Sequence, residues 1–562
     1  MSFDAGLSFA IIELDRSFRM KSLKHYLLII AISALPFISI IANPLMLHSH
    51  DGPMHLARMP AYYKALAEGQ ILPRWASGFD YGYGTPLFNF YYHLPYLSAV
   101  PLMALGLGLV SSFKIILVGG FLLSGVFMFA FADELFGDLR KAYVATILYQ
   151  FAPFHLIDLI VRGDTGEGLA LTFLPLILFF ITRMFHKKES ANAVIPIAIS
   201  TTLLILAHST IGLMLFGVAF VFALLLAPSR SKRMYALLGL GLGVLFTTFF
   251  WLPIMAERKY TYGDLFMKDM YVTHFAPLWM FFVPNFTNTE KLQIGGIAVN
   301  FGIISSISIL VALWQLRQNQ LKGLTKQLVI LSMIAFGCAL FIMQPVSTFL
   351  WSNISILRAF QFPWRFLNIT VFSFAVLGAA VLVKKNTSLR TVVLIALVSI
   401  LSTVVYWYPP LGFDRVNERS LWNYPLNTTF FGEIDSIWSA GMRGKYPTHP
   451  FEIIDGLGTI QNPNKLGTRH TFTVIADSQV RIVDNTQFFP GWRVFVDGKK
   501  TPIEFQDQNW RGLITFSVPA GTHNIRVEFG DSPIRQVAKY ISIISIITAL
   551  IWSFTLRFKH KK

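Results

Sequence analysis

The chain has 562 residues, of which 54% are hydrophobic and 14% charged, and its mean hydropathy is +0.55. Soluble domains carry about 25% charged residues, so this composition excludes an ordinary soluble enzyme and places most of the chain in lipid. The single cysteine, Cys338, excludes a disulfide framework and a cysteine-based metal site. The net charge of +17 does not indicate a nucleic-acid partner, because Lys and Arg are scattered between apolar runs, as in proteins that orient themselves in a membrane.

The first apolar run, Tyr26–Leu47, has no charged side chain and is long enough to cross a bilayer, which takes about 20 apolar residues. It is too long for the apolar region of a cleavable signal, and further spans follow, so we expect no cleaved signal peptide. The N-terminus is predicted to be cytoplasmic because four basic residues precede the run: Arg16, Arg19, Lys21 and Lys24.

Further apolar runs predict a protein with many spans. They are Tyr91–Leu109, Ile115–Ala132, Ala142–Ile157, Leu169–Ile181, Ala193–Ala207, Thr210–Leu226, Met234–Met255, Ile297–Leu316, Leu328–Ile342, Phe366–Val383, Val392–Tyr408 and Tyr540–Leu556. If every run crossed, strict alternation would place several basic loops on the wrong side. These are Arg183/Lys187/Lys188, Arg230/Lys232/Arg233, Arg317/Lys322/Lys326, Lys384/Lys385/Arg390 and the tail from Arg557 to Lys562.

All five basic groups become cytoplasmic if one early run does not cross. The run Tyr91–Leu109 is interrupted by His93, Pro95 and Pro101, so we expect it to lie in the outer leaflet. A tight outer hairpin is expected at Ala207–Thr210. The prediction is about twelve crossings in a cell membrane, plasma or inner, with both termini cytoplasmic.

Four connections then lie on the outer side. The first, from His48 to about Asn89, holds an expected amphipathic helix, Pro53–Glu68, and an aromatic, Gly-rich segment, Trp75–Tyr92. The others are Arg162–Glu167, Glu257–Gly296 and Gln344–Arg365.

Between Tyr408 and Ile534 the composition changes to that of a soluble, strand-rich module. Turns are predicted at Asp497-Gly498 and Pro519–Gly521, and the last span tethers the module. Six short strands are expected: His470–Ile475, Val480–Val483, Trp492–Val496, Ile503–Phe505, Leu513–Val518 and Asn524–Phe529. The predicted fold is mainly α with a C-terminal β-sandwich-like module, divided into residues 1–408 (with the first outer loop, 48–92), 409–535 and 536–562.

Asp51 is the first candidate for chemistry. It follows the first span directly, in His48-Ser-His-Asp51-Gly-Pro-Met-His55, at the water boundary where an enzyme acting on a lipid-held substrate needs a catalytic group. The alternative is a solvated loop acid beside a helix end. The three histidines and Asp51 could bind a divalent ion, but their spacing matches no strong metal-ligand signature, so we predict no cofactor.

Arginines near the hydrocarbon are the second group of candidates, because ionisable groups are costly there. Asp158 lies four residues before Arg162, the spacing at which helical side chains meet, so an internal ion pair is favoured for Asp158. Arg365, at the start of a span, either extends to the interface or holds a phosphate bidentately. Arg358 lies in the same turn. The aromatic residues of Trp75–Tyr92 suit either a sugar-stacking wall or an interfacial belt.

Together these features resemble the GT-C superfamily, integral-membrane glycosyltransferases that use polyprenyl-phosphate-linked sugars. The stretches HSHDGPMHLARMPAYYKALAEGQILPRW, NFYYHLPYL, LIVRGDTGEGLAL and LRAFQFPWRFLN are similar to the prokaryotic group of PTPS-related or YfhO-like membrane proteins. The end of the chain, FFPGWRVFVDGKKTPI and VPAGTHNIRVEFGDSPIR, is similar to the end of the same group.

The resemblance implies that Asp51 acts as general base on the acceptor hydroxyl. Arg162, Arg365 and Arg358 are candidates for the donor phosphate. Residues expected to bind substrate are His50, His55, Asp80, Tyr92, Asp164, Glu167, His208 and Arg258. The second outer loop reads Arg-Gly-Asp-Thr-Gly-Glu and lacks the Asp-x-Asp or Glu-x-Asp pair of the metal-dependent oligosaccharyltransferases.

The predicted function is transfer of one sugar from a polyprenyl-phosphate donor in the bilayer to an extracytoplasmic acceptor, with inversion at the anomeric carbon. A transporter or lipid flippase is the first alternative, although transporter sites lie near the bilayer midplane. A non-catalytic assembly protein whose β module binds glycan is the second.

Overall fold

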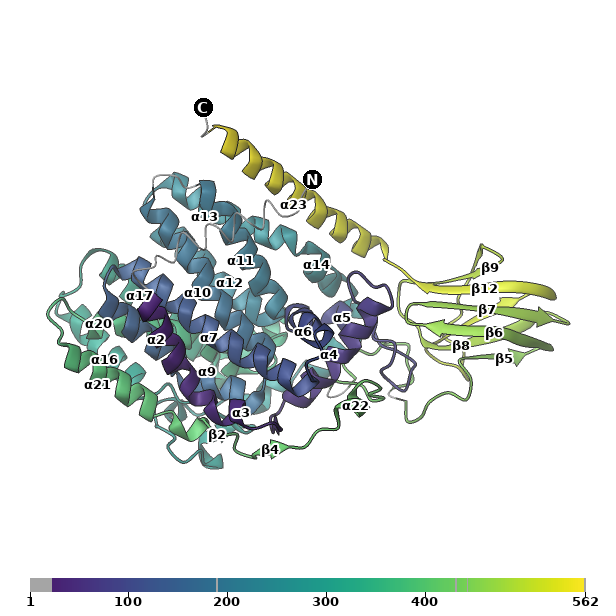
Figure 1. Cartoon of the computed structure of the whole chain (residues 1–562), viewed down its shortest axis with the longest axis horizontal. Helices are drawn as coiled ribbons and strands as arrows, with labels where there is room; N and C mark the ends of the chain where they lie inside the picture. The colour runs from purple at the N-terminus through teal and green to yellow at the C-terminus, as the bar shows by residue number, and fades with distance from the viewer. Residues whose placement is uncertain (1–22, 188–190, 430–431, 442, 560–562) are drawn as a thin grey trace.

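The computed structural model describes residues 23–187, 191–429, 432–441 and 443–559, with side chains to residue 555. A large helical part carries a module of β-strands at one end, and the last helix, α23 (Pro533–Lys559), runs back from that module along the helices (Figure 1). Three of the basic residues before the first span, Arg16, Arg19 and Lys21, lie outside the described residues, as does Lys188. The prediction for the side chains of the basic tail also falls outside them.

Among the described residues, eight helices are long and apolar enough to cross a membrane, or ten if two bent pairs count as one span each. The eight are Leu23–Ala42 (α2, η2 and α3), Leu109–Phe136 (α7), Thr165–His186 (α10), Ser209–Leu226 (α12), Gly323–Ile342 (α17), Pro363–Leu382 (η10 and α20), Leu389–Tyr406 (α21 and η11) and α23. Two expected spans form shorter helices, Ala191–Ala207 (η4 and α11) and α16 (Ile303–Arg317). The total of about twelve crossings therefore stays a prediction.

Two runs that the sequence presents as continuous are bent. Helix α8 (Leu139–Gln150) is followed at 49° by α9 (Pro153–Ile157) and the π-helical turn η3 (Asp158–Arg162). Pro153, the first residue of α9, has no N–H to continue the ladder, which explains this break. Helices α13 (Arg230–Phe246) and α14 (Thr248–Glu257) meet at 63°.

The segment predicted not to cross is short and irregular. It forms α5 (Leu87–Phe90) and the 11-residue α6 (Leu94–Ala104), and α7 begins five residues later. At 1.5 Å per residue α6 is about 16 Å long, too short to span about 30 Å of hydrocarbon. The expected amphipathic helix is α4 (Gly52–Ala67), which packs against α6 and α7.

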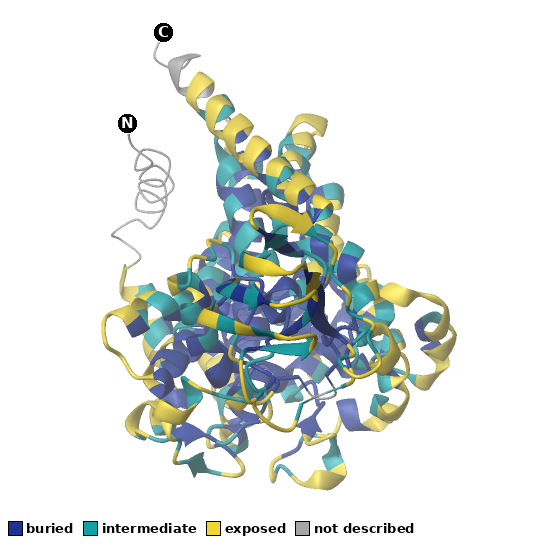
Figure 2. Ribbon diagram, turned by 90° about the vertical axis from the view of Figure 1, so that its right-hand side faces the viewer, coloured by how far each residue is buried: buried dark blue, intermediate teal, exposed yellow. Residues whose placement is uncertain are grey.

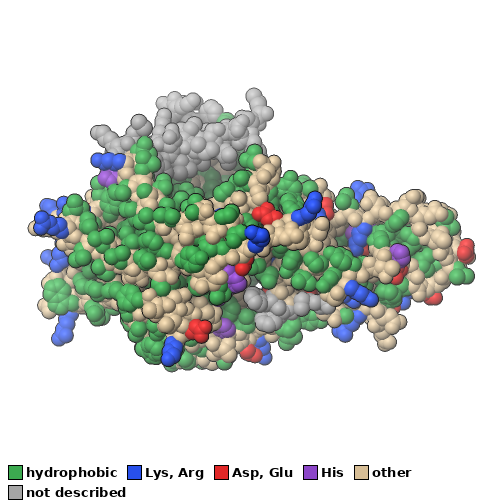
Figure 3. Space-filling view, turned by 60° about the horizontal axis from the view of Figure 1, so that its bottom comes forward, with side chains coloured by type: hydrophobic (Ala, Val, Ile, Leu, Met, Phe, Trp, Pro, Cys, Tyr) green, Lys and Arg blue, Asp and Glu red, His purple; other side chains and the backbone are tan. Residues whose placement is uncertain are grey.

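The basic loops gather at one end of the helical part. Lys232 donates to the carbonyl of Phe185, which joins the start of α13 to the end of α10. Arg140, at the start of α8, donates to the carbonyl of Thr387 in the α20–α21 connection (2.7 Å). Gln315, near the end of α16, donates to the carbonyl of Val381 (2.9 Å). In Figure 3, Lys and Arg side chains lie at the end farthest from the β-strands and also on the β module itself.

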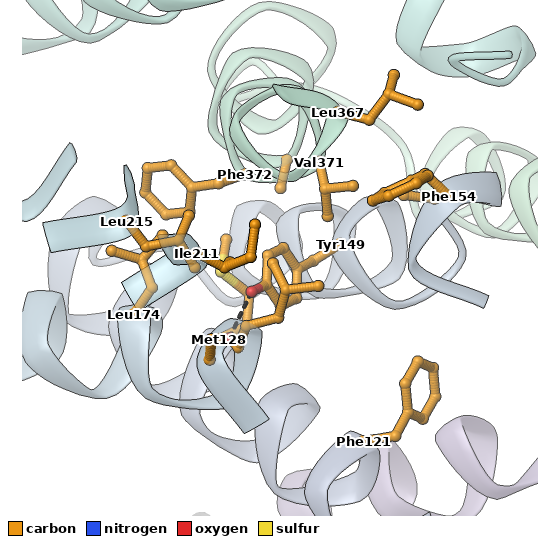
Figure 4. Close-up of a cluster of buried hydrophobic side chains, with 14 of the residues drawn as sticks. Phe121, Met128, Tyr149, Phe154, Leu174, Ile211, Leu215, Leu367, Val371 and Phe372 are labelled. Carbon is orange, nitrogen blue, oxygen red and sulfur yellow. Dashed lines mark hydrogen bonds between the residues drawn. The ribbon is translucent and has the colours of Figure 1, made fainter. Parts of the chain in front are cut away.

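The helices pack around one apolar core. Figure 4 shows part of it, where Tyr149 donates its hydroxyl hydrogen to the carbonyl of Leu171 (2.6 Å) among apolar side chains of α7, α10 and α20. Spans in this core are buried nearly all round. In the apolar stretch of α10, 83% of the residues are buried, and in that of η10–α20, 89% are. In helix α23 only 22% of the residues of the apolar stretch are buried, and exposed residues follow the helix along its length (Figure 2).

The β module contains two antiparallel sheets. One has the order β10-β9-β12-β7-β6 and the other β11-β8-β5. Apolar residues of both sheets form one cluster, which includes Phe451, Phe472, Ile482 and Phe516. The strands are β5 (Phe451–Asp455), β6 (Gly458–Leu466), β7 (Arg469–Ala476), β8 (Val480–Gln487), β9 (Trp492–Val496), β10 (Lys499–Thr501), β11 (Leu513–Val518) and β12 (Gly521–Phe529).

Five of the six expected strands are present, while Ile503–Phe505 makes only an isolated bridge between Glu504 and Thr515. The hairpin predicted at Asp497-Gly498 joins β9 and β10, and both residues have positive φ (50° and 79°), as a type I′ turn requires. The strands β5, β6 and β10 were not predicted from the sequence, because β6 is polar along both faces and β10 is only three residues long.

The module is fastened to the helical part by buried contacts. Trp75 of the first outer loop is 1% exposed and belongs to the apolar cluster of the module, with its ring 5.3 Å from that of Trp492. Arg535, at the start of α23, pairs with Glu257 at the end of α14 (2.9 Å), and Asn89 donates to the same carboxylate (2.8 Å). The first loop, α14 and α23 therefore meet at one buried carboxylate.

The remaining elements are short and lie in the connections. They are β1 (Met46–Leu47), which pairs with β4 (Phe413–Asp414), η5 (Arg258–Tyr260), α15 (Gly263–Phe266), η6 (Met270–His274), η7 (Leu278–Phe281), η8 (Glu290–Leu292), β2 (Gln293–Ile294), β3 (Ile297–Ala298), η9 (Pro345–Ser347), α18 (Thr348–Asn353), α19 (Ser355–Arg358) and α22 (Glu418–Leu421).

Candidate functional site

Four carboxylates surround the guanidinium of Arg162. It pairs with Asp51 (3.0 Å), Asp164 (3.2 Å), Glu167 (2.9 Å) and Asp158. We call these five residues, together with Arg365, the charged cluster. The predicted pair between Arg162 and Asp158, four residues apart, is confirmed.

The cluster is built where the first outer loop meets the second. The backbone N–H of Asp51 donates to the carbonyl of Arg162 (2.7 Å), and that of His50 donates to Val161 (3.1 Å). Gly163 has φ of +72°, and a Cβ there would lie 2.5 Å from Oγ of Ser49, so glycine permits both the turn and the close approach. The π-helical turn η3 ends at this point and presents Arg162 to the loop.

Asp51 occupies the N-cap position of α4, but its side chain makes no capping hydrogen bond. Its carboxylate is aimed at Arg162 and keeps 25% of its side chain exposed. The side chains of Asp158, Asp164 and Glu167 are between 0% and 4% exposed. Among the four carboxylates on Arg162, Asp51 is therefore the one that an external molecule can reach.

Arg365 joins the cluster from a distant part of the chain. Its Nε lies 2.9 Å from Oε1 of Glu167, and its Nη1 donates to Oε1 of Gln361 (2.7 Å). Asn368, one turn further along the same span, donates to Oε2 of Glu167 (3.0 Å). Among the described residues, no protein acceptor meets Nη2 of Arg365, so this donor is available to an anion.

A buried polar network extends the cluster toward α4 and α6. His55, one turn after Asp51 on α4, places Nε2 3.7 Å from Asp164 and Nδ1 3.1 Å from the hydroxyl of Tyr96. Tyr92 donates to Asp164 (3.4 Å), and its ring lies 4.7 Å from that of His208. Burial lowers the pKa of His55 to about 4, so this ring is neutral at pH 7.

His208 caps α12 with its side chain, and its ring borders the charged cluster. The N–H of Ile211 donates to its Nδ1 (3.2 Å), so the neutral ring carries its hydrogen on Nε2. Ligand atoms of Asp164, Glu167 and His208 lie within 4.8 Å of one another. The carboxylates already accept N–H groups, however: Asp164 from Gly166 and Glu167, and Glu167 from Asn368. They also face cationic side chains, because Arg162 lies 3.2 Å from Asp164 and 2.9 Å from Glu167, and Arg365 lies 2.9 Å from Glu167.

Six of the predicted site residues come together in the network: Asp51, Arg162, Arg365, Asp164, Glu167 and His208. His55 and Tyr92 contact it directly. His50 is exposed beside Asp51, where it faces Gly296 of the third outer connection.

Three predicted residues lie elsewhere. Arg258 pairs with Asp264 within its own loop. Asp80 is buried at the border with the β module, where it accepts from the N–H of Arg443 (2.8 Å). Arg358 is half-buried in α19 and, within the described part of the chain, makes no hydrogen bond or ion pair with the cluster. Two contacts were missed from the sequence: Asn368, a polar side chain inside an apolar run, and Trp364, whose ring lies 5.0 Å from the guanidinium of Arg162.

A family model described as 6-pyruvoyl-tetrahydropterin synthase related domain, membrane protein, matches residues 88–409. The chain belongs to this family. The match confirms the predicted resemblance to the PTPS-related group and the membrane location. It covers every member of the charged cluster except Asp51, which lies before its first residue.

One protein is similar to this chain in sequence, and two solved structures are similar to it in fold. An uncharacterized protein of Lactococcus lactis subsp. cremoris (strain MG1363) is 25% identical over 223 residues, which are 37% of this chain and 36% of that protein. The cryo-EM structure of arabinofuranosyltransferase AftD from Mycobacteria is 14% identical over 68% of this chain and 26% of that chain, with a TM-score of 0.43. The crystal structure of ArnT from Cupriavidus metallidurans is 12% identical over 64% and 78%, with a TM-score of 0.29. Both TM-scores are below 0.5, so neither likeness fixes the activity of this chain.

Proposed function

We propose that this PTPS-related protein is a membrane glycosyltransferase that moves a sugar from a polyprenyl-phosphate-linked donor to an extracytoplasmic acceptor. The observation that carries the proposal is the geometry of Asp51. It is a reachable carboxylate, held by a buried guanidinium, and it follows shortly after the end of the first candidate span.

A carboxylate in this position suits general-base catalysis. Asp51 takes the proton of the acceptor hydroxyl as its oxygen bonds to the anomeric carbon of the donor sugar. The bond from that carbon to the phosphate oxygen breaks at the same time, and the phosphate leaves on its lipid. Proton removal by a positioned carboxylate contributes about 10²–10⁴ in rate. One displacement inverts the anomeric carbon.

The arginines take different roles in this proposal. Arg162 already faces four carboxylates, so we assign it to positioning Asp51 rather than to the donor phosphate. Arg365 keeps Nη2 available, and a guanidinium donor stabilises the charge that develops on a leaving phosphate. Arg358, at the end of α19, is proposed as a second contact for the phosphate as the donor enters.

The location of the cluster argues against a transporter. Glu167 lies in the first turn of α10, Arg365 in the first turn of its span and Arg162 in the last turn of its bent pair. Transporter sites lie near the bilayer midplane, in interrupted helices. A cluster at the helix ends suits a substrate held by its lipid tail at the surface of the bilayer.

The test is Asp51→Asn in the full-length protein in proteoliposomes, with release of polyprenyl phosphate as the readout. We expect a loss of about 10²–10⁴ in rate, because the amide does not accept the proton. Asp414→Asn is the matched control, since Asp414 is half-exposed on the same side and pairs only with His48 among the described residues. Full activity of Asp51→Asn would overturn the proposal.

A further inference from the structure

Two outer connections form a layer with unusual composition. Residues 270–286 and 345–357, which we call the loop layer, contain no Asp, Glu, Lys or Arg. They form short helical turns only, η6, η7, η9, α18 and most of α19, and neither is a candidate span. A loop in water normally carries charged and polar side chains, so this composition needs a physical reason.

The inner face of the loop layer is packed against the helical part. Tyr271 of η6 stacks on Trp351 of α18 (5.2 Å), and Trp351 is fully buried. Trp351 also donates its indole N–H to the carbonyl of Ile342 at the end of α17 (3.1 Å). Phe281 of η7 is fully buried against Phe301 (5.2 Å). These contacts join both segments into one layer on the helices.

The outer face of the loop layer carries large apolar side chains. Its exposed polar residues Thr348, Ser352 and Asn353 donate to backbone carbonyls of the layer itself. Trp279 is 54% exposed, Phe286 59%, Val346 65% and Phe349 55%. A short element that is apolar on both sides is stable only when both sides are away from water. Exposed side chains of this size on neighbouring turns therefore indicate that another apolar phase covers them.

The contact between the loop layer and a candidate span, α17, indicates that lipid hydrocarbon is the phase that covers the layer. Phe341, near the end of α17, is 39% exposed, and its ring lies 6.4 Å from that of Phe349 on α18. The outward apolar surface of α17 thus continues onto α18 of the loop layer through this ring contact. Charged residues appear beyond its borders, at Lys268 and Asp269 before η6, at Glu290 after the first segment and at Arg358, the last residue of α19.

The loop layer also contacts the surroundings of the charged cluster. The ring of His274 in η6 lies 4.5 Å from that of Phe362. Phe362 stacks on Trp364 (5.0 Å), and the ring of Trp364 lies 5.0 Å from the guanidinium of Arg162. Two aromatic rings therefore separate the loop layer from the cluster.

We infer that the loop layer is immersed in the membrane leaflet on the side of the β module, where its outward side chains contact lipid hydrocarbon. It forms the lipid-facing wall beside the charged cluster, so a molecule held by a lipid tail reaches the cluster along this wall. The inference concerns a surface and holds whether or not the protein transfers sugar.

The sole cysteine makes a depth measurement direct. In a Cys338→Ser background, we would introduce single cysteines as Phe286→Cys and Phe349→Cys, label each with a nitrobenzoxadiazole dye, and insert the full-length protein into phosphatidylcholine nanodiscs. One quencher is a doxyl group on the lipid chain and the other is iodide in water. Ile334→Cys on α17 (56% exposed) is the control in lipid, and Leu457→Cys in the β module (71% exposed) is the control in water.

We expect the labels at 286 and 349 to be quenched by the lipid-borne doxyl group as strongly as the label at 334, and to be shielded from iodide. The label at 457 should show the reverse. Quenching of 286 and 349 by iodide as strong as at 457 would overturn the inference. Shielding from both quenchers would also overturn it, because a protein partner or a second copy would then cover the layer. Val346→Cys is a third position if either variant folds poorly.

Discussion

At the scale of single residues, the cluster depends on how unequally its carboxylates are exposed. Arg162 is 4% exposed and meets all four, yet only Asp51 among them reaches the surface. A guanidinium presents five donors in a fixed fork, so it can hold several carboxylates in defined directions, whereas an ammonium is a point charge. The orientation of Asp51 is thus a property of Arg162.

Arg162→Lys tests this dependence. The variant keeps the positive charge and loses the fork, so Asp51 is no longer fixed. We expect kcat to fall about 100-fold, since a misplacement of about 1 Å in a catalytic group costs that much, while KM for the donor stays unchanged. Steady-state kinetics with purified donor separates the two constants. A rise in KM alone would instead assign Arg162 to the donor phosphate.

His55 gives a pH-dependent expectation. Burial lowers its pKa from 6.5 to about 4, so below pH 6.5 the unfolded chain binds a proton that the folded chain does not. The free energy of unfolding should therefore fall by about 3 kcal/mol between pH 6.5 and 4, and His55→Gln should remove this part of the slope. Thermal unfolding at several pH values measures it. The variant His449→Gln, at an exposed position, should leave the slope intact, and an unchanged slope in His55→Gln would contradict the prediction.

At the scale of elements, the decisive feature is the close contact of the first outer loop with the end of η3. Gly163 allows it, because its φ is +72° and its missing Cβ leaves room for Ser49. The π-helical turn before it adds a residue to the helix and so rotates Arg162 toward the loop.

Gly163→Ala should separate the loop from η3. The added methyl group would meet Ser49 and the backbone of Gly52 (3.1 Å), so we expect a loss of about 2–4 kcal/mol in stability and a larger loss of activity. Gly137→Ala is the matched control: Gly137 also has positive φ (59°), but a Cβ there meets nothing within 4 Å. That control should cost about 1 kcal/mol and leave activity unchanged. Equal effects of the two substitutions on activity would contradict the role of the contact.

At the scale of the whole molecule, a second buried network joins the β module to the spans. Glu257 accepts from Asn89 of the first loop and from Arg535 and Ser532 of the C-terminal segment. Three segments far apart in the chain thus share one carboxylate, which fixes the module over the helical part.

Glu257→Gln should leave Arg535 buried without a counter-charge and cost about 3–5 kcal/mol. Thermal unfolding in nanodiscs gives the change in stability, and limited proteolysis after residue 529 reports on loosening of the module. The double variant Glu257→Gln/Arg535→Met should be more stable than the single one, because no unpaired charge remains. A double variant as unstable as the single one would show that packing, rather than charge pairing, holds the module.

The sequence by itself determined the membrane class, the positions of most candidate spans, the irregular segment before α7 and five strands of the β module, and it singled out Asp51. These are local properties, because hydropathy, prolines and charge are read within one segment. Only the tertiary structure decided that Arg162 carries four carboxylates, that Arg365 shares Glu167 with it, and that Trp75 is part of the β module. Asp51 and Arg162 are 111 residues apart, and Glu167 and Asn368 are 201 apart. Contacts at such separations depend on how the spans pack, and no local pattern in the chain records them.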